Sequence, residues 1–422
     1  LGFLIGLLVL LHFGYAALTS LPPETLQNLR LADIDVTNGA VVFDFVTLSE
    51  LFGNAAFVEA FGPFIIPLGI LIFCGAVGKS AQFPLHVWLP DAMEGPTPVS
   101  ALIHSATMVV AGVFLVARVF FIYNDAPGAE TLSLIVLIAG VVTAFMAATI
   151  ALRTYDIKRV LAYSTLSQLG YMMAALGLGS MIAAMFHVAT HAFFKGLLFL
   201  AAGSIYHSYL TLDIRKIRGV SKTMKITAVT FLIGALALSG FPYITAGFFS
   251  KEAILAQAYT EHSWAFWILA LTAGMTAFYM FRLVFSVYFG KSDEKHSPHE
   301  SPSNMTVPLL ILAALSICAG YAAHYFAVRL DGDIPHVAHG GLTVLLTSII
   351  FGIGGILLAW AIYARGVVKP STLDKAFGPL STYFHRKWYW DEIYDHTVLA
   401  LVRGVTAIVR GVDRLVIDDT AH

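Results

Sequence analysis

Long apolar segments dominate this sequence and restrict what it can fold into. They occupy residues 64–78, 106–122, 131–152, 225–240, 305–328 and 341–364. Each approaches or exceeds the roughly 20 residues that a helix needs to cross the hydrocarbon core of a bilayer. Because lipid offers no water, every backbone group there must be paired within its own helix. Charged residues make up only 12% of the chain, which is too few for a soluble surface. The sequence therefore predicts an all-α, multi-pass membrane protein.

The apolar pattern divides the chain into about ten predicted membrane-spanning helices. They cover roughly residues 1–18, 62–90, 97–122, 131–153, 158–178, 181–206, 225–259, 264–290, 305–328 and 341–365. With these spans, the acidic connections at 18–61 and near Glu130 and Asp331 fall on one side of the membrane. The basic connections at 153–159 and 215–225 fall on the other side. The positive-inside rule places that basic side in the cytoplasm or the mitochondrial matrix.

Two predicted spans contain residues that interrupt helices, and we expect breaks near 79–90 and near 240–251. Proline removes a backbone donor and glycine loosens the helix. Paired broken helices in corresponding halves indicate a transporter built from inverted repeats. An ordinary pair of kinks is the alternative. The residues concerned are Gly75, Gly78, Pro84 and Pro90 in the first span, and Gly240, Pro242 and Gly247 in the second.

Titratable side chains inside the predicted spans give the main indication of function. A charged lysine at mid-membrane costs about 2.5–3.5 kcal/mol on insertion scales, so several of them are too costly to keep for packing alone. Burial makes such an amine able to release its proton, and histidine titrates near neutral pH unaided. We therefore predict a proton relay. Its candidate residues are Lys79, His104, His187, His191, Lys195, Lys251 and Glu252.

Three of these residues share one face of the span 181–206. His187, His191 and Lys195 are spaced four residues apart, so they stack one helical turn apart, about 6 Å from each other. With trapped water, this stack predicts a wire for protons. Lys79 and Lys251 each follow a predicted break.

Simpler explanations stay open at several of these positions. His104 also fits a buried histidine bonded to a backbone carbonyl, and Lys251 fits a side chain that reaches the interface. His187 and His191 have the spacing of a metal-binding pair on a helix. No third ligand lies nearby in the sequence, so we expect no metal site.

Several classes of function are excluded or disfavoured by composition. The net charge of −1 provides no basic surface for nucleic acid. The two cysteines, Cys74 and Cys318, are far apart and form no iron–sulfur or zinc motif. No glycine-rich nucleotide loop is present between a strand and a helix. We expect this chain to bind no cofactor, so that any electron transfer takes place in other subunits.

Several stretches in order resemble the antiporter-like subunits of complex I, the Mrp cation antiporters and related hydrogenase membrane subunits. One is His187-Val-Ala-Thr-His191-Ala-Phe-Phe-Lys195, and the others lie at 78–108, 156–171 and 247–252. Within that family, Lys251-Glu252 and the tail around Trp388-Tyr-Trp390-Asp391-Glu392 are similar to the L-type subunit of proton-pumping NADH:quinone oxidoreductase.

The resemblance implies two half-channels joined by a hydrated axis. Lys79, with His104 beside it, would belong to the first half within 1–153. The second half would occupy 154–290, with Lys251 near the exit. Further membrane helices would follow in 291–369, and an amphipathic lateral helix in 370–422. The family's carboxylate that tunes the first lysine would lie upstream of Leu1, so we expect the chain to be a fragment lacking N-terminal helices.

The tail from about 396 to 418 has the pattern of an amphipathic helix, with Arg403 and Arg410 among apolar residues. It fits either a membrane-surface anchor or a strut that touches other subunits. The implied partners are protons, the lipid bilayer and other membrane subunits of complex I, especially the neighbouring antiporter-like subunit.

Three functions therefore compete. The first is a proton-translocating subunit of complex I, an enzyme whose redox centres lie elsewhere. The second is a subunit of a Mrp-type cation/proton antiporter, or of a related hydrogenase or carbon-uptake complex. The third is a structural subunit that does not conduct. For location, a bacterial plasma membrane is favoured over the mitochondrial inner membrane.

Overall fold

The computed structural model describes residues 1–21, 45–289, 298–330, 337–369, 372 and 375–413. These residues form helices and connections, and no strand occurs among them apart from an isolated bridge between Asp156 and Asp213. The prediction of an all-α fold is confirmed. By its internal contacts the chain separates into two units, Leu1–Lys369 and Pro370–His422.

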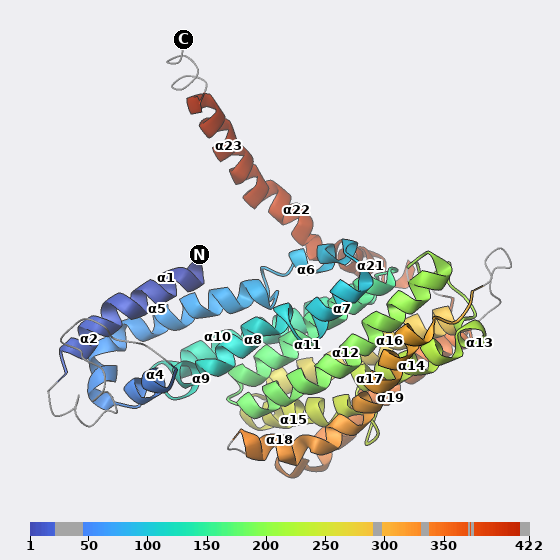
Figure 1. Cartoon of the computed structure of the whole chain (residues 1–422), viewed down its shortest axis with the longest axis horizontal. Helices are drawn as coiled ribbons and strands as arrows, with labels where there is room; N and C mark the ends of the chain where they lie inside the picture. Colours follow the sequence, from blue (N-terminus) through green and yellow to red (C-terminus); the bar gives the residue numbers. More distant parts are fainter. Residues whose placement is uncertain (22–44, 290–297, 331–336, 370–371, 373–374, 414–422) are drawn as a thin grey trace. The chain divides into compact units, whose positions relative to one another are not determined.

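The larger unit is a bundle of long helices, traced in Figure 1 from blue to orange. The main helices are α1 (Gly2–Val9), α2 (Tyr15–Thr19), α4 (Phe45–Phe52), α5 (Ala55–Lys79), α6 (Trp88–Asp91), α7 (Thr97–Ser105), α8 (Ala111–Arg118), α9 (Phe120–Asn124), α10 (Ala129–Ala151), α11 (Ile157–Gly177) and α12 (Met181–Tyr209). They continue with α13 (Val220–Thr223), α14 (Lys225–Ser239), α15 (Ala246–Glu261), α16 (Ser263–Tyr288), α17 (Ser303–Cys318), α18 (Ala323–Arg329) and α19 (Val337–Ala359). Short 3₁₀ or π turns include η1 (Leu10–Gly14), η4 (Ala92–Glu94), η5 (Met108–Val110), η6 (Ala319–Ala322) and η7 (Trp360–Ala364).

Eight helical stretches of the described chain are long and apolar enough to cross a membrane. They are Gly2–Thr19, Ala55–Lys79, Thr97–Arg118, Ala129–Ala151, Met181–Tyr209, Ser263–Tyr288, Ser303–Arg329 and Gly341–Ala364. The remaining predicted spans correspond to α11, which carries many polar residues, and to the α14–α15 pair, whose members are shorter. The total of ten and the inverted repeat stay predictions.

The first predicted break is found within 79–90, but Lys79 lies before it and not after it. α5 continues as a helix through Gly75 and Gly78, and it ends at Lys79. The glycine at 75 serves close packing, because an added Cβ there would lie 2.7 Å from the Cβ of Phe3 on α1. The irregular segment therefore begins after Lys79, and only the short α6 follows it. Glu50 and Glu59, predicted in an acidic connection, lie in α4 and α5.

The second predicted break is found where it was expected. α14 ends at Ser239, and Gly240 follows with φ of 70°, a left-handed conformation that glycine adopts without strain. α15 starts at Ala246 and contains Lys251. Gly247 allows the start of α15 to pack closely against the end of α14, since a Cβ there would lie 1.9 Å from the carbonyl oxygen of Ala237.

A third interruption was missed by sequence analysis. The predicted span 97–122 is divided between α7 and α8, because Ala106 and Thr107 leave the helical region of backbone conformation. The 3₁₀ turn η5 connects the two parts. α7 consequently ends at Ser105, inside the bundle.

The two basic connections lie on the same side of the bundle, as predicted. The backbone N–H of Ile157 donates to Leu212 O, and that of Ile214 donates to Tyr155 O, each at 2.9–3.0 Å. Arg215 donates to both carboxylate oxygens of Asp213, and these hydrogen bonds hold the pKa of Asp213 below its ordinary value. Residues Asp331 and Asp333 of the acidic side lie outside the described residues.

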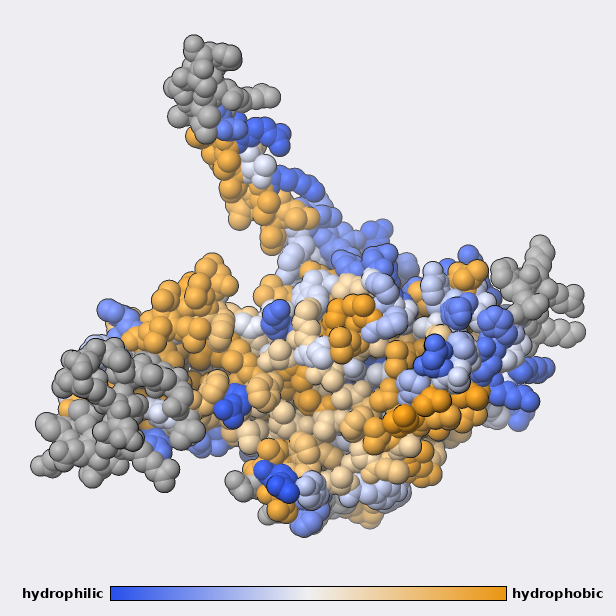
Figure 2. Space-filling model, viewed as in Figure 1, coloured by the Kyte–Doolittle hydropathy of each residue, from blue (hydrophilic) through white to orange (hydrophobic). Residues whose placement is uncertain are grey.

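The smaller unit contains α21 (Gly378–His385), η8 (Lys387–Tyr389), α22 (Trp390–Tyr394), η9 (Asp395–Leu399) and α23 (Ala400–Val412). Ion pairs Lys387–Asp391 (2.5 Å) and Arg386–Glu392 (3.1 Å) stabilise its first turns. Figure 2 shows apolar residues along one side of α23 and hydrophilic ones along the other. The predicted amphipathic pattern is confirmed up to 413, and residues 414–418 lie outside the described residues.

Helices α10 and α11 pack closely at glycines. A Cβ on Gly140 would lie 2.4 Å from the backbone nitrogen of Ala174, and one on Gly170 would lie 2.5 Å from that of Ala144. Helices in membranes associate through such small residues, because lipid tails give no hydrophobic drive for association. This contact holds α11 against the bundle (Figure 1) and sets the position of its polar residues.

We expect Gly170→Ala to lower the melting temperature of the purified protein in detergent by a few degrees. The added methyl forces α10 and α11 apart, and overpacking of this kind costs about 1–3 kcal/mol. Gly62→Ala is the matched control, because a Cβ at Gly62 meets nothing within 4 Å. Equal melting temperatures for the two variants would contradict the described contact.

Candidate functional site

The predicted stack on α12 is present and fully buried. His187, His191 and Lys195 all have 0% exposed surface. The ring centroids of the two histidines are 6.1 Å apart, one helical turn, as the spacing predicted. α12 can place them inside because other helices, including α7, α11, α14 and α15, surround it.

α11 supplies side-chain partners to this stack. The amine of Lys195 donates to the hydroxyl of Ser164 and, at 3.1 Å, to the carbonyl oxygen of Leu161. Gln168 Oε1 lies 3.1 Å from Nε2 of His187. Ser164 and Gln168 are four residues apart, so α11 presents a polar stripe to that of α12.

α15 contributes a second set of partners at the other end of the stack. Ser250 Oγ is 2.9 Å from Nδ1 of His187 and accepts a hydrogen bond from Thr190 at 2.8 Å. Lys251, the next residue, is 4% exposed and donates to the carbonyl oxygen of Leu238 at 2.5 Å. Its Nζ also lies 5.6 Å from the centroid of the Tyr171 ring, a cation–π distance.

The carbonyl that holds Lys251 is available because α14 ends there. Leu238 lies in the last turn of α14, where carbonyls lack a partner within the helix. The N–H groups of Gly240 and Phe241 bind Ala237 O and Leu236 O instead. The predicted break thus creates an acceptor for a buried ammonium group.

The unpredicted end of α7 acts in the same way on the other side of the stack. Ser105 is the last residue of α7, and its carbonyl oxygen is 3.1 Å from Nδ1 of His191. Its neighbour His104 is 0% exposed and stacks on Phe199 with ring centroids 5.3 Å apart. Neither ring nitrogen of His104 has a hydrogen-bond partner within the described chain.

Further buried polar atoms lie along this line with no partner among the described residues. They are Nε2 of His191, Nε2 of Gln168 and the hydroxyl of Ser167. Buried polar groups in proteins are nearly always hydrogen-bonded to protein or to ordered water. We therefore expect water molecules at these atoms, between the titratable side chains.

Two predicted residues are placed differently from the rest. Lys79 is exposed at the end of α5, so the described chain does not bring it into the buried line. Glu252 is buried, and it forms no ion pair with Lys251 in the part of the chain that the structure describes. Successive helical residues point in different directions, which accounts for this separation.

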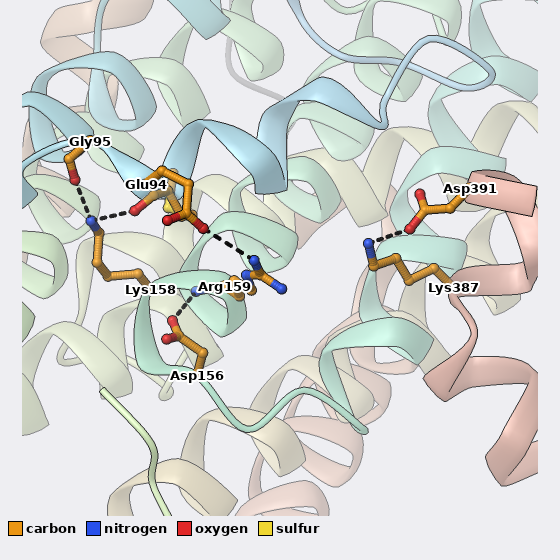
Figure 3. A network of polar contacts seen from close by, with 8 residues as sticks. Glu94, Gly95, Asp156, Lys158, Arg159, Lys387 and Asp391 are labelled. Atoms are coloured by element: carbon orange, nitrogen blue, oxygen red, sulfur yellow. Dashed lines mark hydrogen bonds and ion pairs between the residues drawn. The ribbon is translucent and has the colours of Figure 1, made fainter. Parts of the chain in front are cut away.

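Lys158 is a buried residue that sequence analysis treated only as a basic residue of a connection. It is 4% exposed, and its amine donates to Met93 O and Gly95 O, both at 2.6 Å. Figure 3 shows this contact beside the Arg159–Glu94 pair, at 3.3 Å, and the N-cap of α11 by Asp156. Lys158 also lines a cavity of about 780 Å³ together with Thr97 and His207.

Five residues of the site had no predicted role, namely Ser105, Ser164, Gln168, Tyr171 and Ser250. The spacing of 164, 168 and 171 along one face of α11 is a signal that could have identified three of them. Nothing in the sequence marks the Ser105 carbonyl, because any residue supplies a backbone oxygen.

The chain is similar to several known proteins. The family described as NADH:quinone oxidoreductase/Mrp antiporter, TM, matches residues 37–276. The chain is 42% identical over 400 residues to NAD(P)H-quinone oxidoreductase chain 5 of Picosynechococcus, covering 85% of this chain and 60% of that protein. It is 41% identical over 356 residues to NADH-quinone oxidoreductase subunit L of Campylobacter jejuni, covering 84% and 59%.

A solved structure is also similar. The Mrp complex of Dietzia contains a chain that superposes with a TM-score of 0.61 at 26% identity, over 93% of this chain and 48% of that chain. Overall, the chain spans about 60% of the length of the curated relatives it matches.

We expect Lys158→Met to loosen the connection between α6 and α7. The variant leaves two buried carbonyl oxygens without a donor, which costs about 1–3 kcal/mol. Amide hydrogen exchange of a peptide covering residues 92–97 should become about ten-fold faster. Lys216→Met, at an exposed lysine on the same side, is the control and should leave that exchange unchanged.

Proposed function

This chain belongs to the NADH:quinone oxidoreductase/Mrp antiporter transmembrane family, and from that premise we propose that it is the proton-translocating L-type membrane subunit of a complex I-type enzyme. The observation that carries the proposal is the buried line from Lys195 through His191 and His187 to Ser250 and Lys251. Such side chains are expensive in a membrane and are characteristic of ion pathways.

The chemistry of this line suits protons. A neutral imidazole accepts a proton at one ring nitrogen and releases it from the other. His187 has neighbours on both nitrogens, Gln168 on one side and Ser250 on the other. The hydroxyl groups of Ser250 and Ser164 both donate and accept, so each can pass a proton between a lysine or histidine and water.

The two lysines are held as reversible proton carriers would be. Their described hydrogen-bond partners are neutral, namely the hydroxyl of Ser164 and the carbonyl oxygens of Leu161 and Leu238. A neutral partner stabilises the ammonium form less than a carboxylate would, so the proton can leave at a lower free energy cost.

We propose that electron transfer takes place in other subunits and that this chain contributes no active site of its own. Its partners would be neighbouring antiporter-like membrane subunits, and its location a bacterial plasma membrane. The name of the Campylobacter jejuni relative, subunit L, supports partner subunits, and its bacterial source supports the proposed location. Lys79 would join the pathway as part of the first half-channel, although the described chain leaves it exposed.

A Mrp-type cation/proton antiporter subunit is the second candidate. The structural similarity to the Dietzia Mrp complex favours it. The higher identity to quinone oxidoreductase subunits favours the first candidate. Sodium transport distinguishes the two candidates. An antiporter exchanges sodium for protons, driven by the proton gradient, and needs no NADH.

The central test is proton pumping by vesicles that contain the full-length complex with Lys195→Ala. We expect the number of protons pumped per electron to fall several-fold in complexes whose assembly has been verified. Lys195→Arg separates a proton carrier from a structural cation, because arginine keeps its charge and its proton. If Lys195 is a proton carrier, the arginine variant loses pumping. If Lys195 is only a structural cation, the arginine variant keeps pumping.

The control for this test is Lys216→Ala, which removes an exposed lysine outside the line. Unchanged pumping per electron in Lys195→Ala would overturn the relay. Sodium counterflow driven by a proton gradient, without NADH, would select the antiporter instead.

A further inference from the structure

We propose that α11 and α16 hold a second line of hydroxyl groups, which takes protons from Lys195 toward Lys251 in parallel with the histidines, and that Tyr279 is its central residue. The inference rests on the proposed function, because it describes a second route through the same relay. Tyr279 lies on α16, is fully buried, and is not part of the line through His191 and His187.

The hydroxyl of Tyr279 lies at the partner of Lys195. It is beside the hydroxyls of Ser164 and Thr276, and Ser164 is also the side chain to which the Lys195 amine donates. The Tyr279 hydroxyl completes no hydrogen bond of ordinary geometry within the described chain. Buried hydroxyls are nearly always hydrogen-bonded to protein or to ordered water. We therefore expect a small rotation of Ser164, or a water molecule, to complete this contact.

Tyr279 continues a polar stripe along α16. Thr272, Thr276 and Tyr279 are spaced by four and three residues, so they share one face of the helix, and all three are fully buried. The two threonine hydroxyls donate to the carbonyl oxygens of Ile268 and Thr272, at 2.7 and 2.9 Å. Each threonine oxygen keeps lone pairs, so it can also accept a hydrogen bond from a neighbour.

A matching stripe on α11 faces these residues. Ser164, Ser167 and Tyr171 are spaced by three and four residues, and all three are fully buried. The Tyr171 hydroxyl donates to Leu269 O on α16. Seven residues earlier on α11, Ser164 lies beside Tyr279. The residue numbers rise on α11 as they fall on α16, so the two helices are antiparallel. Ser167 and the two threonines consequently fall between these two contacts.

The two stripes extend from one lysine to the surroundings of the other. At one end Ser164 accepts from the Lys195 amine, and at the other end the centroid of the Tyr171 ring lies 5.6 Å from Nζ of Lys251. Ser167, between the two ends, has a buried hydroxyl without a hydrogen-bond partner in the part of the chain that the structure describes. We expect ordered water at Ser167, which would join the hydroxyls of the two helices.

Hydroxyl groups in this order can transfer one proton without any redox partner. The ammonium of Lys195 gives its proton to Ser164 Oγ, whose own proton passes to the Tyr279 oxygen. The original Tyr279 proton moves to the water at Ser167, which passes one on to the Lys251 amine. Every hydroxyl keeps one proton, so only the two lysines change charge, and rotation of the hydroxyls resets the line.

Proton pumping by vesicles that contain the full-length complex tests this second line. His187→Gln keeps a polar side chain but takes up no proton at neutral pH, and Tyr279→Phe removes only a hydroxyl. We expect each single variant to keep at least half of the protons that the wild type pumps per electron. The double variant should fall to the level of Lys195→Ala, because both routes are then interrupted.

Tyr288→Phe combined with His187→Gln is the matched control. Tyr288 is another buried tyrosine of α16, but its hydroxyl donates to Ala228 O on α14. This combination should pump as many protons per electron as His187→Gln alone. Ser167→Ala combined with His187→Gln interrupts the line at a second point, and it decides the question if the Tyr279 double variant fails to assemble.

Three results would overturn the second line. If His187→Gln alone pumps no better than Lys195→Ala, the histidines are the single route. If Tyr279→Phe alone falls to that level, Tyr279 does not lie on a parallel route. If the double variant pumps as well as His187→Gln, Tyr279 transfers no protons. In all three cases Lys195→Ala still lowers pumping, so the proposed function stands. That function fails only if Lys195→Ala pumps normally.

Discussion

The burial of the Lys195 amine is the constraint on which the rest of the structure depends. A charged lysine at mid-membrane costs about 2.5–3.5 kcal/mol even when lipid and water can adapt around it. Lys195 has no exposed surface, and its hydrogen bonds to Ser164 and Leu161 come from one neighbouring helix. Those bonds require α11 to lie at a fixed distance from α12. The close glycine contacts at Gly140 and Gly170 hold α11 there.

Helix ends supply many of the acceptors that buried cations and imidazoles need. The end of α14 gives the carbonyl for Lys251, the end of α7 gives one for His191, and the turn after α6 gives two for Lys158. A continuous helix uses its carbonyls internally, so each interruption frees oxygens at the depth where a polar side chain lies. The interruptions are therefore part of the site.

Sequence alone predicted the helices, the α12 stack and the break before Lys251, because apolar length and four-residue spacing depend on side-chain type. It did not predict the end of α7 at Ser105, the exposure of Lys79 or the burial of Lys158. In the first and third cases the deciding partners are backbone carbonyls, which leave no mark in a sequence. In the second case, Gly75 packs against Phe3 and does not end the helix, so α5 continues and Lys79 lies at its exposed end.

The positions of the two lysines make their charges interdependent. His187, which contacts Ser250 next to Lys251, and Lys195 are eight residues apart on α12, a rise of roughly 12 Å. For any two positive charges roughly 12 Å apart, the repulsion is roughly 1.4 kcal/mol at an effective dielectric constant of 20, which changes a population about ten-fold. In the proposed relay, a proton arriving at one lysine thus promotes release from the other. The buried histidines join the two sites, and this coupling requires no movement of the helices.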